Sequence, residues 1–188
     1  MITRNEAIKF LESQIQNKNI IKHMLACEAI MRALAKKFEP DREEEWAIAG
    51  LLHDGDYKPD VKMEEQGIRI AKLLEDKGYE VPETVKHTMA AHNWRATKVE
   101  PQSKMDWSLF CCDTLTGLIV AVALVRPEKK LSVVTLENIL KKWKEKSFAA
   151  GTRREDIALC EEKLGIPLPE FITIGLTAMQ KISGELGL

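Results

Sequence analysis

Apolar side chains recur at intervals of three and four along the segment from about residue 19 to residue 38. They are Ile20, Met24, Cys27, Met31, Leu34 and Phe38. On an α-helix this spacing places all of them on one face. The pattern predicts a long amphipathic helix, which must bury that face against other elements. No hairpin signal or internal repeat is found elsewhere in the chain.

A second long helix is predicted at residues 104 to 125. The run from Leu118 to Val125 is rich in branched residues and would also suit a buried strand. Because the apolar character continues back to Trp107, its length favours a helix at the centre of a bundle. Further helices are predicted at residues 3 to 16, 41 to 53, 63 to 77, 82 to 92, 135 to 145, 153 to 164 and 169 to 184. We expect an all-α, single-domain bundle of about eight or nine helices.

Charge and composition exclude several classes of partner. The chain has 28 Lys plus Arg and 29 Asp plus Glu, a net charge of -1, which gives no general attraction for a nucleic acid polymer or an anionic membrane. The N-terminus lacks a secretory signal, and no apolar run is expected to span a membrane. We therefore expect a cytoplasmic protein. The four cysteines form no CxxC pair, which predicts reduced, mostly buried thiols.

Polar residues interrupt apolar helix faces at four places in the chain. The most informative is the pair His53 and Asp54, which directly follows two leucines at the end of an apolar helix. A carboxylate that emerges from the core there needs a cation, a metal or several hydrogen bonds to offset its desolvation. His23, His92 and Asp113 interrupt other apolar faces in the same way, which predicts one shared inward site.

The side chains of this predicted site are of the types that bind divalent transition metals. Imidazole and carboxylate groups together suit manganese, iron, cobalt, nickel or zinc. Four protein ligands would leave coordination positions for water. The residues alone therefore predict a metal site without selecting the metal.

The order of His23, then His53 and Asp54, then His92, then Asp113 resembles that of the HD superfamily of metal-dependent phosphohydrolases. The resemblance covers roughly residues 20 to 125, and the C-terminal helices from residue 126 to 188 match no motif. It implies a helical bundle with one divalent ion held by four ligands: His23, His53, Asp54 and Asp113. Water activated by the metal would then attack the phosphorus atom of a small phosphorylated metabolite or nucleotide.

Roles for other residues follow from their places near the motif. Asp54 and His92 are predicted to be catalytic, with His92 contacting substrate or water, although a surface histidine at a helix end is the alternative. Lys58 and Arg95 are predicted to bind the anionic substrate. Asp56 would position water or phosphate, or would lie in a solvated turn. His87 is predicted to be a surface residue, because it is rotated by about 140° from His92 on a helix.

The number of metal ions is predicted from Gln66. Many relatives carry a histidine followed by glycine in this segment, whereas this chain has Gln66 followed by Gly67. A neutral amide is a weak ligand for transition metals, so we expect one ion, with Gln66 lining the substrate pocket.

Two other functions remain open at this level. The first is a catalytically inactive HD-fold module that binds a metal and an anion for sensing. The second is a helical interaction protein in which the site is only a structural staple and the basic segment of residues 141 to 154 is the contact surface. That segment is predicted more simply to be a solvated face. The sequence also leaves open whether the chain forms a homodimer.

Overall fold

The computed structural model describes residues 1–188 and contains helices but no strands, which confirms the predicted all-α fold. The α-helices are α1 (Arg4–Gln14), α2 (Lys18–Phe38), α3 (Glu43–Leu52), α4 (Arg69–Glu75), α5 (Glu83–Ala91), α6 (Trp94–Thr97), α7 (Lys104–Leu124), α8 (Leu136–Trp143), α9 (Arg154–Leu159), α10 (Leu168–Lys181) and α11 (Ser183–Leu186). Short 3-10 turns occur at Pro40–Arg42, Met63–Glu65 and Leu131–Val133, and a π-helical turn at Cys160–Leu164 continues α9.

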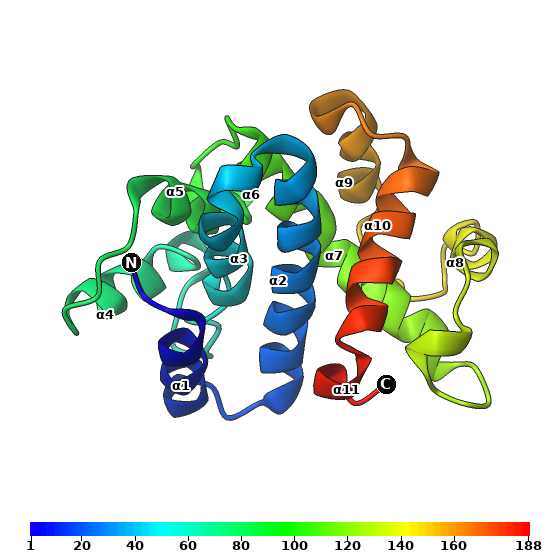
Figure 1. The fold of residues 1–188 in the computed structure, drawn as a ribbon, viewed down its shortest axis with the longest axis horizontal. Coiled ribbons are helices and arrows are strands. Elements are labelled where there is room, and N and C mark those ends of the chain that lie inside the picture. Colours follow the sequence, from blue (N-terminus) through cyan, green and yellow to red (C-terminus); the bar gives the residue numbers. More distant parts are fainter.

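The two longest helices, α2 and α7, form the centre of the bundle. Helix α2 packs against α3, α7 and α10, and Figure 1 shows α10 beside α2, with α7 crossing behind both. A core cluster of 47 buried residues includes side chains from α2, α3, α7 and α10. By length and composition α7 would be able to span a membrane, contrary to the expectation from the sequence, but 61% of its most apolar window is buried inside the protein. It is therefore placed as a core helix.

Helices α2 and α3 approach each other most closely at Gly50. A Cβ atom on Gly50 would lie 2.9 Å from Cγ of Met31 and 3.0 Å from the backbone carbonyl group of Cys27. Only glycine allows this contact between a helix backbone and its neighbour. Cys27 is one turn after His23 and Gly50 is one turn before His53, so this contact brings the two histidines together.

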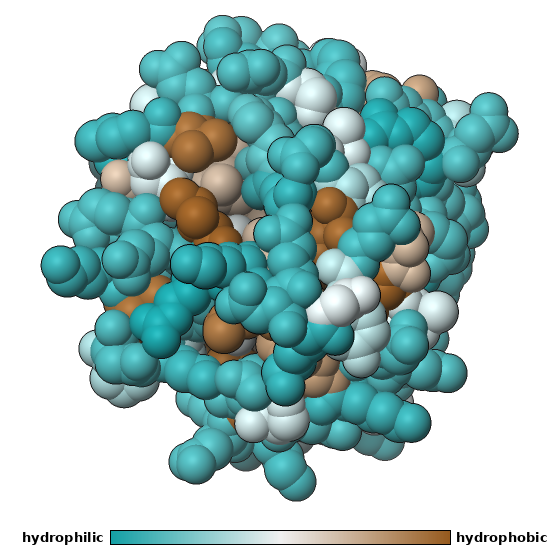
Figure 2. Space-filling model, turned by 90° about the vertical axis from the view of Figure 1, so that its left-hand side faces the viewer, coloured by the Kyte–Doolittle hydropathy of each residue, from teal (hydrophilic) through white to brown (hydrophobic).

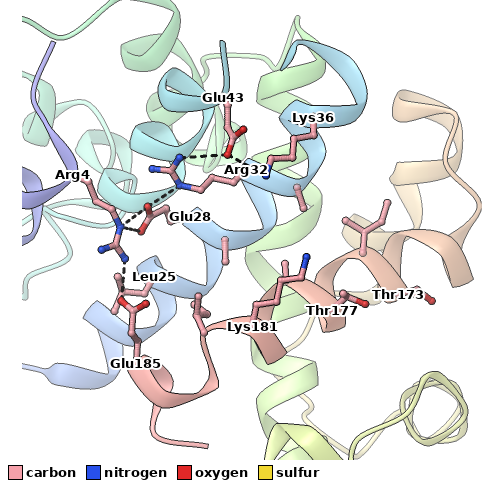
Figure 3. A pocket seen from close by; sticks show the side chains of 15 residues that line it. Arg4, Leu25, Glu28, Arg32, Lys36, Glu43, Thr173, Thr177, Lys181 and Glu185 are labelled. Atoms are coloured by element: carbon pink, nitrogen blue, oxygen red, sulfur yellow. Dashed lines mark hydrogen bonds and ion pairs between the residues drawn. The ribbon is translucent and has the colours of Figure 1, made fainter. Parts of the chain in front are cut away.

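Ion pairs hold the outer side of α2 to its neighbours. The carboxylate of Glu28, whose side chain is only 4% exposed, accepts hydrogen bonds from Nε of Arg4 at 2.7 Å and from Nε of Arg32 at 3.1 Å. Arg4 also pairs with Glu185 of α11 at 3.0 Å. The two guanidinium groups offset the desolvation of this buried carboxylate. The cluster ties α1, α2 and α11 together (Figure 3).

The prediction of one helix over residues 63 to 77 is wrong for its first part. A 3-10 turn and a reversal at Gly67, with φ of 76°, precede α4. The reversal places Gly67 against the carbonyl oxygen of Met89, which would lie 2.0 Å from a Cβ atom. Two short helices, α6 and α11, were not predicted, because four residues are too few to show a helical period.

The surface on the side of α1, α4 and α5 is mostly hydrophilic. Figure 2 shows hydrophobic side chains on this face only as small patches that hydrophilic side chains separate. All four cysteines are free and buried, as the sequence predicted.

Candidate metal centre

The four predicted ligands meet at one point between α2, the end of α3 and α7. Nε2 of His23 lies 3.0 Å from Oδ1 of Asp113, 3.2 Å from Nε2 of His53 and 3.6 Å from Oδ2 of Asp54. Nε2 of His53 lies 3.7 Å from the same oxygen of Asp54 and 3.9 Å from Oδ1 of Asp113. Two ligand atoms that bind one ion at about 2.1 Å are separated by about 3.0 to 3.5 Å. The separations here are close to that range.

The hydrogen bonds of the two histidines direct their lone pairs at each other. Nδ1 of His53 donates to the carbonyl oxygen of Gly50 at 2.9 Å. The hydroxyl of Thr116 donates to the carbonyl oxygen of Asp113 at 2.8 Å, so it accepts a hydrogen bond from Nδ1 of His23 at 2.9 Å. When both rings are neutral, as metal binding requires, their Nε2 lone pairs face each other. This arrangement is repulsive unless a cation lies between them, so the donor set fits a divalent metal ion.

Electrostatics favours the same ion. Burial lowers the pKa of His53 to about 4, so this ring stays neutral and can act as a ligand. Burial opposes ionisation of Asp113, but the hydrogen bond from His23 outweighs it and holds the pKa of this carboxyl below its usual value. The pKa of His23 is raised because the carboxylates of Asp113 and Asp54 outweigh the effect of burial. The cluster therefore attracts positive charge.

His92 lies in the site and not on the surface. It is 5% exposed at the end of α5, and its Nε2 lies 3.4 Å from Oδ1 of Asp54. Its Nδ1 donates to the carbonyl oxygen of Met89. Burial lowers the pKa of His92, but the hydrogen bond to Asp54 and the charge of that carboxylate outweigh it and raise the pKa to about 9. The ring is then an imidazolium that donates to the Asp54 oxygen facing away from the other ligands.

Asp56 has a structural role, and the alternative of a solvated turn is wrong, whereas a role in positioning water or phosphate stays a prediction. Its side chain is buried, with a residue exposure of 1%. It accepts hydrogen bonds from the backbone amides of Gly67, at 3.0 and 3.1 Å, and of Ile70, at 2.8 Å. These bonds fix the reversal that leads into α4.

The three predicted substrate contacts already have protein partners. Lys58 donates to Oε1 of Gln14 at 3.0 Å, and Gln66 accepts from Nδ2 of Asn93 at 3.1 Å. Lys58 and Gln66 line one hollow of about 720 Å³, and none of the four predicted ligands lines it. Their contact with substrate stays a prediction.

Arg95 forms a two-pronged ion pair with the buried carboxylate of Asp156, at 2.6 and 3.0 Å. Arg153 pairs with the same carboxylate at 2.8 Å. Asp156 thus joins α6 to the start of α9, and a substrate anion would have to compete with it for Arg95. The predicted substrate role of Arg95 also stays a prediction.

His87 is not a simple surface residue, contrary to the prediction. Its side chain is 33% exposed, and its Nδ1 lies 3.1 Å from Oδ2 of Asp106. Asp106 also completes the capping box of α7 with Ser103. His87 therefore joins α5 to the start of α7, outside the metal cluster.

Two residues near the ligands were not predicted from the sequence. Thr116 orients His23, and its place three residues after Asp113 is the only local signal for this role. Cys27 lies one turn after His23, and its Sγ is 3.9 Å from Nε2 of that residue. Burial raises the pKa of Cys27 well above its ordinary value, so it is a neutral thiol in the metal-free protein, but together with His23, His53 and Asp113 it forms a group that could hold a metal ion.

The site is open on the side of His23 and Asp113. The side chains of His23, Asp54 and Asp113 are 25%, 18% and 21% exposed, whereas His53 is fully buried. A hollow of about 370 Å³ lies on this side, between the two exposed ligands and the loop of residues 149 to 152.

Arg154 organises that loop, so it is not part of a solvated basic face as predicted. Its guanidinium donates to the carbonyl oxygen of Phe148 at 2.7 Å, of Trp143 at 2.9 Å and of Glu145 at 3.2 Å. It also donates to the carbonyl oxygens of Lys142 and Thr152. One half-buried cation thus holds the segment from α8 to α9 beside the metal centre.

A larger groove, of about 560 Å³, lies between α2 and α10 and contains none of the ligands. All but one of its charged side chains pair with one another, as the contacts of Arg4, Glu28, Arg32 and Glu43 show (Figure 3). The exception is Lys181. Size alone therefore does not identify the functional site.

Residues 20–118, slightly more than half of the chain, match the HD domain family. With the ligand cluster in place, the chain belongs to this family, whose members are in general metal-dependent hydrolases. No curated protein and no solved structure matches the chain. The match includes all four predicted ligands and His92, and it ends within α7, before the loop that Arg154 holds.

Proposed function

We propose that the protein is a metal-dependent phosphohydrolase that acts on a small phosphorylated metabolite or nucleotide. The observation that carries the proposal is that Nε2 of His23 and Nε2 of His53 each lie within 3.0 to 3.9 Å of carboxylate oxygens of both Asp54 and Asp113, with one side open to substrate. A structural staple would need no such opening.

The side chains have distinct roles in this proposal. When bound, the ion supplies Lewis acidity and lowers the pKa of water. Asp54 directs Oδ2 toward His23 and His53 and Oδ1 toward His92, so it both binds the ion and orients the imidazolium. His92 would turn its Nε2 hydrogen, which points to Oδ1 of Asp54 in this structure, to a phosphate oxygen or to water at the edge of the cluster. Both groups are largely shielded from bulk water, which strengthens their electrostatic effect.

We further propose a single transition-metal ion from the set manganese, iron, cobalt, nickel and zinc. The neutral amide of Gln66 is a weak metal ligand. His92 contacts Oδ1 of Asp54, whereas His23 and His53 lie near Oδ2. Two tightly held ions per chain in elemental analysis would contradict this proposal, with Asp54 as the bridging ligand.

The remaining proposals concern partners and location. Lys58, Arg95 and Gln66 would contact the substrate on release from their present partners. A net charge of -1 supports a small substrate and not a nucleic acid polymer, and a cytoplasmic location is retained as a proposal.

The test is a metal and substrate panel. Protein stripped with a chelator is reloaded with each of the five metals, and the release of inorganic phosphate is measured for nucleoside monophosphates, sugar phosphates and simple aryl phosphates. We expect hydrolysis with at least one metal and none in the chelator. Asp54→Asn should lose both metal and activity, whereas the exposed Asp41→Asn should keep both. Full activity after proven metal removal would overturn the proposal.

The alternative is a catalytically inactive module that binds a metal and an anion. It is favoured if the metal-loaded protein binds inorganic phosphate, measured by calorimetry, but hydrolyses no ester in the panel with any metal.

A further inference from the structure

One face of α7 leads away from the metal centre. Asp113, Gly117, Val120 and Leu124 follow at spacings of four, three and four, so they share a helix face that extends for about 16 Å. The last three line a hollow of about 470 Å³. Its other walls are Asn19, Lys22 and Ala26 of α2 and the C-terminal residues Leu186 to Leu188. We refer to it as the tail pocket.

The tail pocket is joined to the open side of the metal centre. His23, Thr116 and Gly117 line both the tail pocket and the smaller hollow at Asp113. A molecule with one end at the cluster can therefore extend past His23 into the tail pocket.

Gly117 keeps this junction wide. It lies within α7, where glycine is less favourable than alanine, and its backbone is helical, so its conformation does not require glycine. A Cβ atom there would meet no atom within 4 Å, so packing within the protein does not require it either. A larger side chain at this position would project into the space that the two hollows share.

Lys22 is the cationic residue of the tail pocket and has no partner. It is half-buried, and it forms neither an ion pair nor a hydrogen bond. Its ammonium group lies over Gly187, 2.8 Å from where a Cβ atom would be. Val120 and Leu124 line the same pocket, and no protein carboxylate lies within 4.0 Å of the ammonium group. Since Lys22 precedes His23 on a helix, the two side chains are about 100° apart, and Lys22 points away from the cluster.

We infer that the tail pocket binds the leaving group of the substrate, and that this group has an apolar body and a second anionic group. The inference rests on the proposed function. The phosphate ester lies at the metal centre, the apolar body contacts Val120, Leu124 and Leu186, and the second anion pairs with Lys22. Lys22 is thus a specificity-determining residue.

The apolar wall lies outside the part of the chain that matches the HD domain family. The ligands fall within residues 20–118, whereas Val120, Leu124 and the C-terminal leucines follow it. The family part supplies the chemistry and Lys22, and the remaining part supplies the apolar wall that contacts the leaving group.

The test uses two phosphonates, phenylphosphonate and 4-carboxyphenylphosphonate, which cannot be hydrolysed at the phosphorus-carbon bond. Their dissociation constants are measured by calorimetry on metal-loaded protein. We expect the carboxylated probe to bind at least tenfold more tightly. Lys22→Met keeps the apolar stem of the side chain, and it should abolish this preference while phenylphosphonate still binds. Lys18→Met, one turn earlier on the same helix and exposed, should retain the preference.

A second pair of variants tests the position of the pocket. Gly117→Leu should weaken both probes at least tenfold with unchanged metal content and helix content, whereas Gly117→Ala should bind both nearly as the native protein does. If Gly117→Leu fails to fold, amide chemical shifts of the native protein decide: Lys22, Gly117 and Leu188 should shift on addition of the carboxylated probe.

Several results would overturn the inference. They are equal affinity for the two probes, a preference that survives in Lys22→Met, equal losses for both probes in that variant, or shifts confined to residues outside the tail pocket. Failure of the proposed function is a separate outcome: the probes would then bind as expected, but no phosphate ester would be hydrolysed. Conversely, hydrolysis without a preference for the carboxylated probe would refute the tail pocket alone.

Discussion

At the scale of single residues, the metal cluster depends on hydrogen bonds that other residues make to the candidate ligand side chains. His23 is oriented by Thr116, and His53 by the carbonyl oxygen of Gly50. Partners of this kind fix which ring nitrogen carries the proton and therefore which one faces the metal.

Thr116→Val should weaken metal binding without removing a ligand. Valine has nearly the shape of threonine but offers no acceptor for Nδ1 of His23, so we expect a loss of about tenfold to a hundredfold in affinity. Competition with a chromophoric chelator measures it. Thr116→Ser restores the hydroxyl and should bind metal nearly as the native protein does, and equal affinity in all three proteins would refute this role.

The stability of the metal-free protein should be greatest near pH 6.5. Burial lowers the pKa of His53 to about 4, below the ordinary value of about 6.5, so the unfolded chain binds more protons and stability falls as the pH drops from 6.5 toward 4. For His92, Asp54 outweighs burial and raises the pKa to about 9. The contribution of His92 to the stability of the folded protein is complete below pH 6.5 and is lost as the pH rises toward 9. His23, whose pKa is also raised, acts in the same direction.

Urea unfolding in chelator at pH 5, 6.5 and 9 checks this dependence. His92→Asn removes one group with a raised pKa. It should reduce the loss of stability between pH 6.5 and pH 9, while the loss of stability between pH 6.5 and pH 5 remains. A native protein that is more stable at pH 9 than at pH 6.5 would contradict the assignment.

At the scale of elements, the backbone contact between α2 and α3 sets the distance between the two ligand histidines. Gly50→Ala should destabilise the protein by about 1 to 3 kcal/mol, because its methyl group would press against Met31 and the backbone of Cys27. It should also weaken metal binding, since His23 and His53 lie one turn from the contact.

Denaturant midpoints and metal titration measure both effects of Gly50→Ala. Gly184→Ala is the control, because a Cβ atom on Gly184 meets nothing within 4 Å. Unchanged stability and unchanged metal affinity in Gly50→Ala would show that the helices separate there without effect on the site.

At the scale of the whole molecule, the metal should stabilise the fold. The ligands come from α2, the end of α3 and α7, which are separated along the chain, so an unfolded chain cannot present them together. At a free metal concentration one hundred times the dissociation constant we expect about 2.7 kcal/mol of added stability. Thermal unfolding with and without metal measures it. Asp113→Asn should lose most of the shift and Asp41→Asn should keep it, and an absent shift in the native protein would contradict a preformed site.

Local patterns in the sequence were sufficient for most of the helices and for the set of candidate ligands, whose role in metal binding stays a prediction. Both signals are properties of neighbouring residues: helical periodicity predicted α2, and the length of the apolar run predicted α7. His23, His53, Asp54 and Asp113 were recognisable because a polar side chain on an apolar helix face needs a buried partner. The start of the helix predicted from residue 63 was wrong, since the carboxylate of Asp56 fixes a reversal there.

Only the tertiary structure decided which side chains are free to act. Arg95 follows His92 closely in the chain, but it pairs with Asp156, 61 residues later. Lys22, in contrast, has no partner and lies in a pocket completed by the last residues of the chain. The sequence by itself determined most of the helices and the chemistry of the candidate ligands. The pairing of Arg95 and the free charge of Lys22 depended on how the helices pack, because these contacts join residues that no local spacing relates.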